Sequence, residues 1–252
     1  MKVTILGCGA SGGVPWIGGD WGSCDPHEPR NRRRRASIVV EAGGSRVLID
    51  TSPDLRAQCL DANISSFDAV IYTHDHADHT HGIDELRPIV QRRRSPMPIF
   101  GRADAIESIS RRFDYAFGGG AYPPIVAPNV IDGPFHVGDV AVTPFEQDHG
   151  GPISLGLRFG AIAYSTDLVA LDEPAFAALA GVRVWIVDAL RDKPHPTHAH
   201  VDLTLEWIAR VRPERAILTH MTAGLDYATL AARLPAGVEP AHDGLVIELP
   251  DE

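Results

Sequence analysis

The chain has 252 residues and a formal net charge of −10, from 33 acidic and 23 basic residues, and 44% of its residues are hydrophobic. This length suits one large domain or two small ones, and the apolar fraction allows a sizeable core, which excludes a disordered or fibrous protein. The acidic balance argues against a protein that grips long nucleic acid, because such proteins carry a basic surface.

Neither a membrane-spanning segment nor a signal peptide is predicted. No apolar run approaches the roughly 18 residues that a membrane helix needs. Residues 1–6 (MKVTIL) are too short in their apolar part for a signal peptide and lead into a glycine-rich turn. The three cysteines, Cys8, Cys24 and Cys59, lack the spacing of a disulfide framework. We therefore expect a cytoplasmic protein with no membrane partner.

Short β-type runs alternate with helical stretches along the chain. Apolar alternation and β-branched content predict strands at residues 3–6, 38–41, 46–50, 69–73, 140–145, 154–159, 161–165, 184–188, 216–219 and 245–248. Glycine-containing turns predict two hairpins, one joining 38–41 to 46–50 and one joining 154–159 to 161–165.

Helices are predicted between these strands. The first follows Ser52 and Pro53, taken as a cap and the first helical position. The others are predicted at residues 82–91, 103–112, 201–211 and 223–233. This succession is compatible with two packed sheets and helices outside, although periodicity alone does not select that architecture over other α/β layers.

Residues with metal-binding side chains gather just after predicted strands, where a rigid sheet positions the loops that follow it. These strand-end residues and their neighbours are Asp50, Thr73, His74, Asp148, His149, Asp167, Thr219 and His220. Histidine is abundant, with 12 in the chain, and several lie beside aspartates. The function is therefore sought in these clusters.

The densest cluster is the segment 73–79 (THDHADH), directly after the apolar run 69–72. On a loop leaving a strand, His74 and His76 can converge on one metal, while Asp78 and His79 turn toward a second. Imidazole and carboxylate groups are ligands of Zn²⁺, Mn²⁺ and Fe. Histidines that only decorate a surface turn are the alternative, but this density at a strand–loop junction favours a metal site.

The HxHxDH spacing from residue 74 to residue 79 resembles the signature of the metallo-β-lactamase superfamily. Three further ligand positions of that family are filled in order, by His149, by Asp167 in the segment YSTD and by His220 in the segment LTH. The resemblance covers nearly the whole chain, from about residue 1 to residue 248.

The resemblance implies a four-layer αββα sandwich of two mixed β-sheets with helices outside, formed by residues 1–252 as a single domain. It also implies two divalent metal ions, Zn or Mn, with Fe as an alternative. The implied ligands are His74, His76 and His149 for one ion and Asp78, His79 and His220 for the other, with Asp167 bridging them.

Three aspartates near these ligands have further implied roles. Asp78 is expected to take part in catalysis as well as in metal binding. Asp50 and Asp75 either orient the imidazoles from behind or are ordinary hydrogen-bonded turn residues, and the sequence leaves both interpretations open.

The superfamily includes β-lactamases, thioesterases, lactonases, nucleases and phosphodiesterases, so the site must select among them. Histidine at position 79 is typical of the phosphodiesterase branches. The segment 7–15 (GCGASGGVP) resembles the opening of nuclease-type and PhnP-type members, although it could be only a tight turn. We expect Ser11, in this segment, to contact substrate.

A non-ligand histidine gives the third indication. His198 lies 22 residues before His220 and resembles a histidine of those phosphodiesterases that contacts phosphate and protonates the leaving oxygen. An imidazole suits this task because its pKa lies near the operating pH. A solvated residue at a helix start is the alternative, and His200 could exchange roles with His198 in binding substrate.

Together these features predict a phosphodiesterase that attacks a small nucleotide or sugar phosphodiester, cyclic or linear, with a metal-activated hydroxide. A tRNA-processing nuclease is an alternative, but no inserted basic arm is present and the net charge opposes it. An acyl hydrolase on the same metals would also fit the ligand set, and a non-catalytic nucleotide-binding module would fit the fold. A homodimer is implied by the resemblance alone.

Two features of the N-terminal region remain open in the sequence. The segment 30–35 (RNRRRR) is either solvated surface or directs one arginine toward a phosphate. Cys24 is the one cysteine where related enzymes hold a structural zinc with several, so an additional zinc is not expected. Cys8, beside the expected site, is predicted to be a small buried apolar residue.

Overall fold

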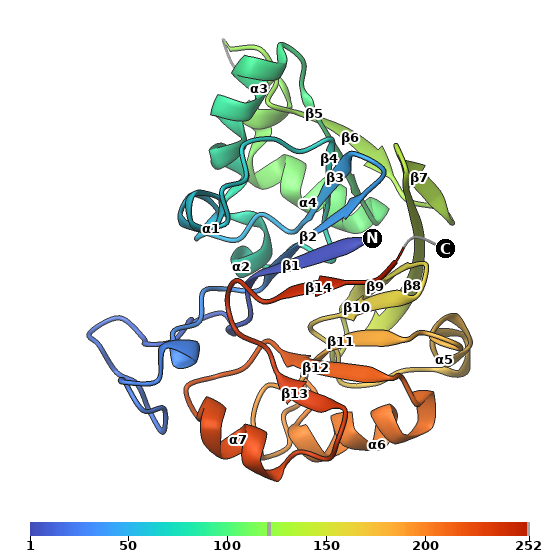
Figure 1. The fold of residues 1–252 in the computed structure, drawn as a ribbon. Helices are drawn as coiled ribbons and strands as arrows, with labels where there is room; N and C mark the ends of the chain where they lie inside the picture. The colour runs from blue at the N-terminus through green and yellow to red at the C-terminus, as the bar shows by residue number, and fades with distance from the viewer. Residues whose placement is uncertain (120–121, 251–252) are drawn as a thin grey trace. The chain divides into compact units, whose positions relative to one another are not determined.

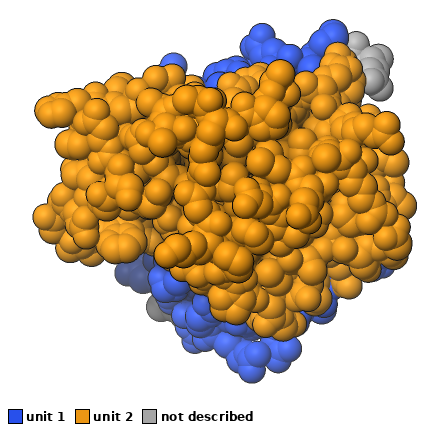
Figure 2. All heavy atoms as spheres, turned by 90° about the horizontal axis from the view of Figure 1, so that it is seen from below, with its two compact units in different colours: residues 1–6, 37–141, 244–252 blue, residues 7–36, 142–243 orange. Residues whose placement is uncertain are grey.

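The computed structural model describes residues 1–119 and 122–250 (Figure 1). The chain forms two compact units, coloured separately in Figure 2. Unit 1 consists of residues 1–6, 37–141 and 244–252, and unit 2 of residues 7–36 and 142–243. The expectation of one domain over residues 1–252 stays a prediction.

Unit 1 is built on a seven-stranded sheet of order β14-β1-β2-β3-β4-β5-β6. Its strands are β1 (Lys2–Gly7), β2 (Ser37–Ala42), β3 (Ser45–Ile49), β4 (Ala69–Ile71), β5 (Met97–Gly101), β6 (Val126–Val130) and β14 (Val246–Glu248). Its helices are α1 (Leu55–Asp61), α2 (Ala77–Thr80), α3 (Arg87–Arg93) and α4 (Ala103–Arg112), with the 3₁₀ helices η2 (Ile83–Leu86) and η3 (Asp114–Phe117). The strands β3 to β6 are parallel, while β2 and β3 form the first predicted hairpin.

The second seven-stranded sheet has the order β13-β12-β11-β10-β9-β8-β7. Its strands are β7 (Phe135–Val137), β8 (Val140–Asp148), β9 (Ile153–Phe159), β10 (Ile162–Ser165), β11 (Val184–Asp188), β12 (Arg215–Thr219) and β13 (Val238–Pro240). Unit 2 also contains η1 (Pro29–Asn31), α5 (Glu173–Ala178), α6 (Val201–Val211) and α7 (Tyr227–Arg233). The strands β10 to β13 are parallel, and β9 and β10 form the second predicted hairpin.

Both sheets mix parallel and antiparallel pairs and carry helices, which confirms the predicted α/β fold class. In each sheet, helical connections return the chain so that consecutive parallel strands end at the same edge. Loops that follow those strands are therefore gathered by the sheet itself. Among the described residues, no helix combines the length and apolar character needed to cross a bilayer.

The core of unit 1 explains how its sheet holds its register. Val39 and Leu48, directly paired across the β2–β3 hairpin, are fully buried. On α4, Ile106 and Ile109 lie three positions apart, bury one helix face and join the same apolar cluster. Burying side chains of this size stabilises the fold by roughly 1.5–3 kcal/mol each.

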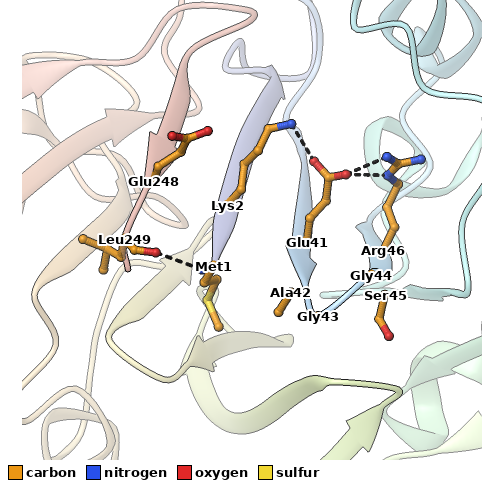
Figure 3. Close-up of a pocket in the computed structure, with 10 residues that line it drawn as sticks. All are labelled: Met1, Lys2, Glu41, Ala42, Gly43, Gly44, Ser45, Arg46, Glu248 and Leu249. Carbon is orange, nitrogen blue, oxygen red and sulfur yellow. Dashed lines mark hydrogen bonds and ion pairs between the residues drawn. The ribbon is translucent and has the colours of Figure 1, made fainter. Parts of the chain in front are cut away.

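A row of charges crosses the outer part of the first sheet on β1, β2 and β3 (Figure 3). Lys2 Nζ lies 2.9 Å from the Glu41 carboxylate, which also receives hydrogen bonds from Arg46 at 2.6 and 2.8 Å. Burial alone would raise the pKa of Glu41, but these hydrogen bonds outweigh it and hold the pKa below its ordinary value. One carboxylate thus links three neighbouring strands.

The structure corrects several element predictions. The sequence pattern did not predict β5, β6, β7 or β13; Pro98 in β5 and Pro128 in β6 weaken the strand pattern that a sequence shows. The first helix begins at Leu55 rather than at Pro53, because Ser52 Oγ accepts a hydrogen bond from Asp54 N and closes a turn there. The predicted helix 82–91 is divided into η2 and α3.

The last predicted helix begins later than expected, at Tyr227, because Asp226 caps it. Asp226 Oδ1 accepts from Thr229 N at 2.9 Å, and Oδ2 accepts from Asn31 Nδ2 at 2.7 Å and from Asp25 N at 3.1 Å. Burial acts to raise the pKa of Asp226, but the hydrogen bonds hold it well below its ordinary value. The residue therefore ties η1 to α7.

We expect Asp226→Ala to lower the free energy of unfolding by about 1–2 kcal/mol, because α7 loses its cap and Asn31 loses an acceptor. Urea titration by circular dichroism measures this. Asp172→Ala removes the cap of α5, where the Asp172 carboxylate accepts from Ala175 N within its own helix, and should have a smaller effect. Equal losses in the two variants would contradict the linking role of Asp226.

Candidate functional site

The first ligand cluster lies in unit 1, on the loop that follows β4. His74 and His79 are buried, at 3% and 0% exposure, whereas His76 is exposed at the N-cap position of the short helix α2. The ring centroid of His74 lies 4.5 Å from that of His76 and 4.4 Å from that of His79. Asp78 Oδ2 lies 3.4 Å from His79 Nε2, so this loop presents three imidazoles and a carboxylate together.

A buried carboxylate at the end of β3 sets the orientation of two of these rings. Asp50 Oδ2 lies 2.7 Å from His79 Nδ1 and accepts the Thr73 hydroxyl at 2.8 Å. The Thr73 hydroxyl hydrogen is used in that bond, so Thr73 Oγ1 accepts from His74 Nδ1 at 3.0 Å. Both Nδ1 atoms are donors, which leaves Nε2 of His74 and of His79 as the atom with a lone pair for a metal.

Asp75 belongs to a different network from Asp50. Its Oδ2 accepts a hydrogen bond from Ser108 Oγ at 2.6 Å and forms an ion pair with Arg112, both on α4. Burial raises the pKa of Asp50 in spite of the hydrogen bonds from His79 and Thr73. Asp50 is thus the carboxylate behind the imidazoles, and Asp75 ties the loop to α4.

The second ligand cluster lies in unit 2, at the ends of β8, β10 and β12. Asp167 Oδ1 lies 3.9 Å from His149 Nε2, and Asp167 Oδ2 lies 3.4 Å from His220 Nε2. All three residues are at most 2% exposed. One carboxylate therefore presents each of its two oxygens toward a different imidazole, which is the arrangement that a bridging ligand requires.

His149 is oriented by the backbone of the loop after β11. Its Nδ1 lies 2.7 Å from the Thr197 carbonyl oxygen, which can only accept, so Nδ1 carries the hydrogen and Nε2 keeps the lone pair. The same loop is held against its neighbours by backbone hydrogen bonds from Ala199 N to Leu168 O and from Leu190 N to Ala199 O. The positions of Asp167 and His198 are fixed through these bonds.

His198 is held by a carboxylate that the sequence did not single out. Asp188, fully buried at the end of β11, lies 3.0 Å from His198 Nδ1 through Oδ2. The His198 ring stacks on that of His220, with centroids 4.9 Å apart and an interplanar angle of 12°. The signal for Asp188 was present, since it ends a predicted strand as Asp50 does.

Three residues of the two clusters have backbone conformations in the left-handed region. The φ angles are 63° for Asp50, 56° for Asp167 and 57° for His220. This conformation is unfavourable for residues with a side chain and is retained where the surroundings impose it, often at functional sites. Each residue follows a strand, and the turn aims its side chain into a cluster.

The glycine-rich segment after β1 lies against the β12 end in unit 2. Gly9 forms backbone bridges with Arg35 and Met221, and Met221 N donates to Cys8 O. Ser11 is exposed in the turn that follows. His200 precedes α6, where its carbonyl accepts from Thr204 N. The structure thus places Ser11 on a segment paired next to His220.

A partly buried carboxylate, that of Asp243, supports this segment. Asp243 accepts hydrogen bonds from Cys8 N at 3.1 Å and from Arg34 N at 2.8 Å. Burial raises the pKa of Asp243 to about 6, although the backbone donor of Arg34 acts to lower it. The Cys8 thiol is buried beside it, and burial raises its pKa well above the ordinary value, so it remains a neutral thiol.

The arginines of segment 30–35 divide between the core and the surface. Arg33 is 1% exposed and donates hydrogen bonds to the carbonyl oxygens of Thr222 and Leu225. Arg30 pairs with Glu28 and lies over the Tyr227 ring. Arg33 is therefore a structural clamp, an interpretation that the sequence had not offered.

The donor chemistry of both clusters fits divalent metals. Each unit offers buried imidazole nitrogens together with a carboxylate oxygen, and tautomers fixed from behind leave the ligand atoms available. No thiolate takes part in either cluster, so the set suits Zn²⁺, Mn²⁺ or Fe.

Comparison with known proteins agrees with this chemistry. The model of the beta-lactamase superfamily domain matches residues 45–221. A solved diphosphatase of the PhnP family is 34% identical, with a TM-score of 0.92 over 99% of this chain and 98% of that one. The chain therefore belongs to the beta-lactamase superfamily and to the PhnP family of its solved relative.

Two other relatives extend the comparison. A protein named octanoyltransferase, from Porphyromonas gingivalis, is 33% identical over 97% of this chain, which spans 51% of that protein. The chain thus covers about half the length of this curated relative. The Zn²⁺-bound structure of PqqB from Methylobacterium extorquens is 20% identical over 99% of this chain and all of that one, with a TM-score of 0.77, and shares the fold.

We expect Asp50→Asn to weaken metal binding about 10- to 100-fold, because the amide has no charge and only one acceptor oxygen. If that oxygen faces His79 and the Thr73 hydroxyl, the NH₂ group faces Thr73 N, which donates to Asp50 Oδ1 at 2.8 Å in the wild type. Asparagine tolerates the left-handed φ of position 50, so the backbone should be kept. Metal titration followed by elemental analysis measures the change.

The matched control is Asp75→Asn, on the loop itself but bonded to Ser108 and Arg112. It should leave metal affinity nearly unchanged. If the two variants lose metal equally, the orienting role of Asp50 is wrong.

A pH dependence of stability follows from Asp243. Its pKa is about 6 in the folded chain against an ordinary value of 3.8, so the folded state binds more protons between these values. The contribution of Asp243 to the free energy of unfolding therefore falls as the pH rises from about 4 to 6, by on the order of 3 kcal/mol.

Urea unfolding of wild type and Asp243→Asn at about pH 4.5 and 7.5 tests this. The stability of the wild type relative to the variant should decline toward the higher pH. An identical difference at both pH values would show that Asp243 titrates normally.

Proposed function

We propose that the chain is a binuclear metal-dependent phosphodiesterase that acts on a small phosphorylated substrate, a cyclic or linear nucleotide or sugar phosphodiester. The observation that carries the proposal is His198. It is oriented by Asp188 beside Asp167 and His220, yet it lies outside the ligand set of the family motif. A thiolate that leaves a thioester has no need of such a proton donor, whereas the alkoxide that leaves a phosphodiester does.

The proposed metal ligands are those that the family motif implies. They are His74, His76 and His149 for one ion, Asp78, His79 and His220 for the other, and Asp167 for both. With two divalent ions bound, Zn or Mn with Fe as an alternative, the centre would lower the pKa of a water molecule and neutralise charge on the phosphoryl oxygens. The two oxygens of Asp167, directed at His149 and His220, support its shared position.

The residues of the chain supply the proton transfer and the orientation. His198 Nδ1 is held by Asp188, so Nε2 is the atom that donates a proton to the leaving oxygen. The buried Asp188 carboxylate accepts from Nδ1 and thereby keeps the ring in one tautomer and one orientation. Asp78 is proposed to act in catalysis beside its ligand role, and Ser11 and His200 to contact the substrate.

The charge of the chain supports a small substrate, and its relatives support phosphate chemistry. The net charge of −10 offers no general basic surface for long nucleic acid. The solved PhnP-family relative is a diphosphatase, which favours phosphate chemistry over acyl chemistry. We also propose a cytoplasmic location, since all three cysteines are free thiols, and retain a homodimer as a prediction.

We expect His198→Ala to reduce kcat on a diester with a poor leaving group by about 10²- to 10⁴-fold, because the leaving oxygen loses its proton donor. Metal content should stay that of wild type. Activity on 2′,3′-cyclic nucleotides and elemental analysis are measured together, and chelator should abolish the wild-type activity.

Two further variants serve as controls. His136→Ala, an exposed histidine on β7, should retain both activity and metal. Asp167→Ala should lose both. If metal-loaded wild type turns over thioesters or lactones but no diester, the proposed reaction is wrong.

A further inference from the structure

We propose that the turn at residues 11–13 is a nucleotide subsite, in which the Trp16 indole stacks on the base. This inference rests on the proposed function and names its substrate class as a nucleotide diester rather than a sugar phosphodiester. All of the residues concerned lie in unit 2.

The turn is an extension of the candidate site within that unit. Ala10 N donates to Met221 O at 3.2 Å, and Gly13 N donates to Ala10 O at 2.8 Å. Met221 directly follows His220 in the chain. The backbone ladder therefore carries the exposed turn beside a proposed metal ligand.

Trp16 lies directly over this turn. A Cβ atom built on Gly12 would be 2.8 Å from Trp16 Nε1 and 2.9 Å from Cδ1, closer than real Cβ atoms come. The φ of Gly12 lies outside the left-handed region, so backbone conformation does not require glycine there. Any residue other than glycine at position 12 would place a Cβ atom against the indole and displace it.

The loop that carries Trp16 is ordered by backbone hydrogen bonds, while the indole is open to a ligand. Trp16 N donates to Asp20 O at 2.8 Å and Gly19 N donates to Trp16 O at 2.9 Å, which closes a tight loop behind the side chain. Trp16 is nevertheless 48% exposed. A loop whose backbone is already ordered loses little conformational freedom when its aromatic side chain stacks on a ligand, and this favours binding.

A cation lies beside the next residue of the same turn. A Cβ atom built on Gly13 would lie 3.6 Å from Arg35 Nη1, which places the guanidinium beside the turn. Guanidinium groups bind phosphate through paired hydrogen bonds, and every base offers a flat face to an indole. A planar ring joined to a phosphate is the chemistry of a nucleotide, and Trp16 and Arg35 at adjacent residues of the turn suit these two groups.

The test compares two substrates with one reacting group. Adenosine 2′,3′-cyclic phosphate and 1-O-methylribose 2′,3′-cyclic phosphate differ only in the base. For Trp16→Ala and Gly12→Ala we expect kcat/KM on the nucleotide to fall roughly 5- to 150-fold, mainly through KM, with the base-free substrate unchanged. Trp16→Phe should retain most of the preference, because a phenyl ring still stacks.

The matched control is Ile17→Ala, since Ile17 is the fully exposed neighbour on the same loop. It should leave both substrates unaffected. The subsite is refuted if Trp16→Ala lowers both substrates equally or neither, or if Ile17→Ala has the same effect as Trp16→Ala.

A binding measurement separates this inference from the proposed reaction. Calorimetry with adenosine monophosphate and ribose 5-phosphate needs no turnover. Tighter binding of the former, lost in Trp16→Ala, supports the subsite even if no diester is hydrolysed. Diester hydrolysis with equal binding of the two ligands overturns the subsite and leaves the proposed reaction standing.

Discussion

A buried carboxylate at the end of a strand fixes a histidine ring in each unit, and the chemistry of both clusters depends on this interaction. Asp50 does so for His79 at the end of β3, and Asp188 for His198 at the end of β11. An imidazole can bind a metal or transfer a proton only through the nitrogen that is not already occupied. The carboxylate therefore decides which atom of the ring is available.

The buried carboxylate contacts a different kind of histidine in each unit. In unit 1, Asp50 acts through Thr73 as well, so a single carboxylate orients His74 and His79. In unit 2 a backbone carbonyl orients His149, a proposed metal ligand, and the Asp188 carboxylate instead holds His198. The Asp188 carboxylate holds Nδ1 of His198, which suits the proton-donor role that we propose for this ring.

Within each unit, sheet topology gathers the residues of that unit's cluster because parallel strands end at a common edge. The helices of each unit return the chain to that edge, and left-handed turns at Asp50, Asp167 and His220 redirect the side chains. The strain of such turns is local, while the sheets that impose them are extensively buried. The features that this chain shares with the beta-lactamase superfamily are the order of its strands and the residues that follow them, and its overall composition does not show them.

Much of the fold was predictable, and the failures have physical causes. Helices α4 and α6 match the predicted bounds because their amphipathic faces and polar ends are local features. Strands such as β6 were missed because Pro128 interrupts the pattern and the strand is stabilised by pairing with β5, far away in sequence. Asp188 was within a predicted strand, but its partner His198 lies 10 residues later, and only the folded loop after β11 brings it back to the carboxylate.

The sequence by itself determined which side chains have metal-binding chemistry and in what order they follow their strands, because ligand type and strand pattern are local properties. Only the tertiary structure decided which nitrogen each imidazole presents, that Asp75 serves α4 rather than a ring, that Arg33 is buried, and that Trp16 lies over Gly12. These outcomes depend on contacts between side chains and on the space left for them, and no local pattern encodes that space.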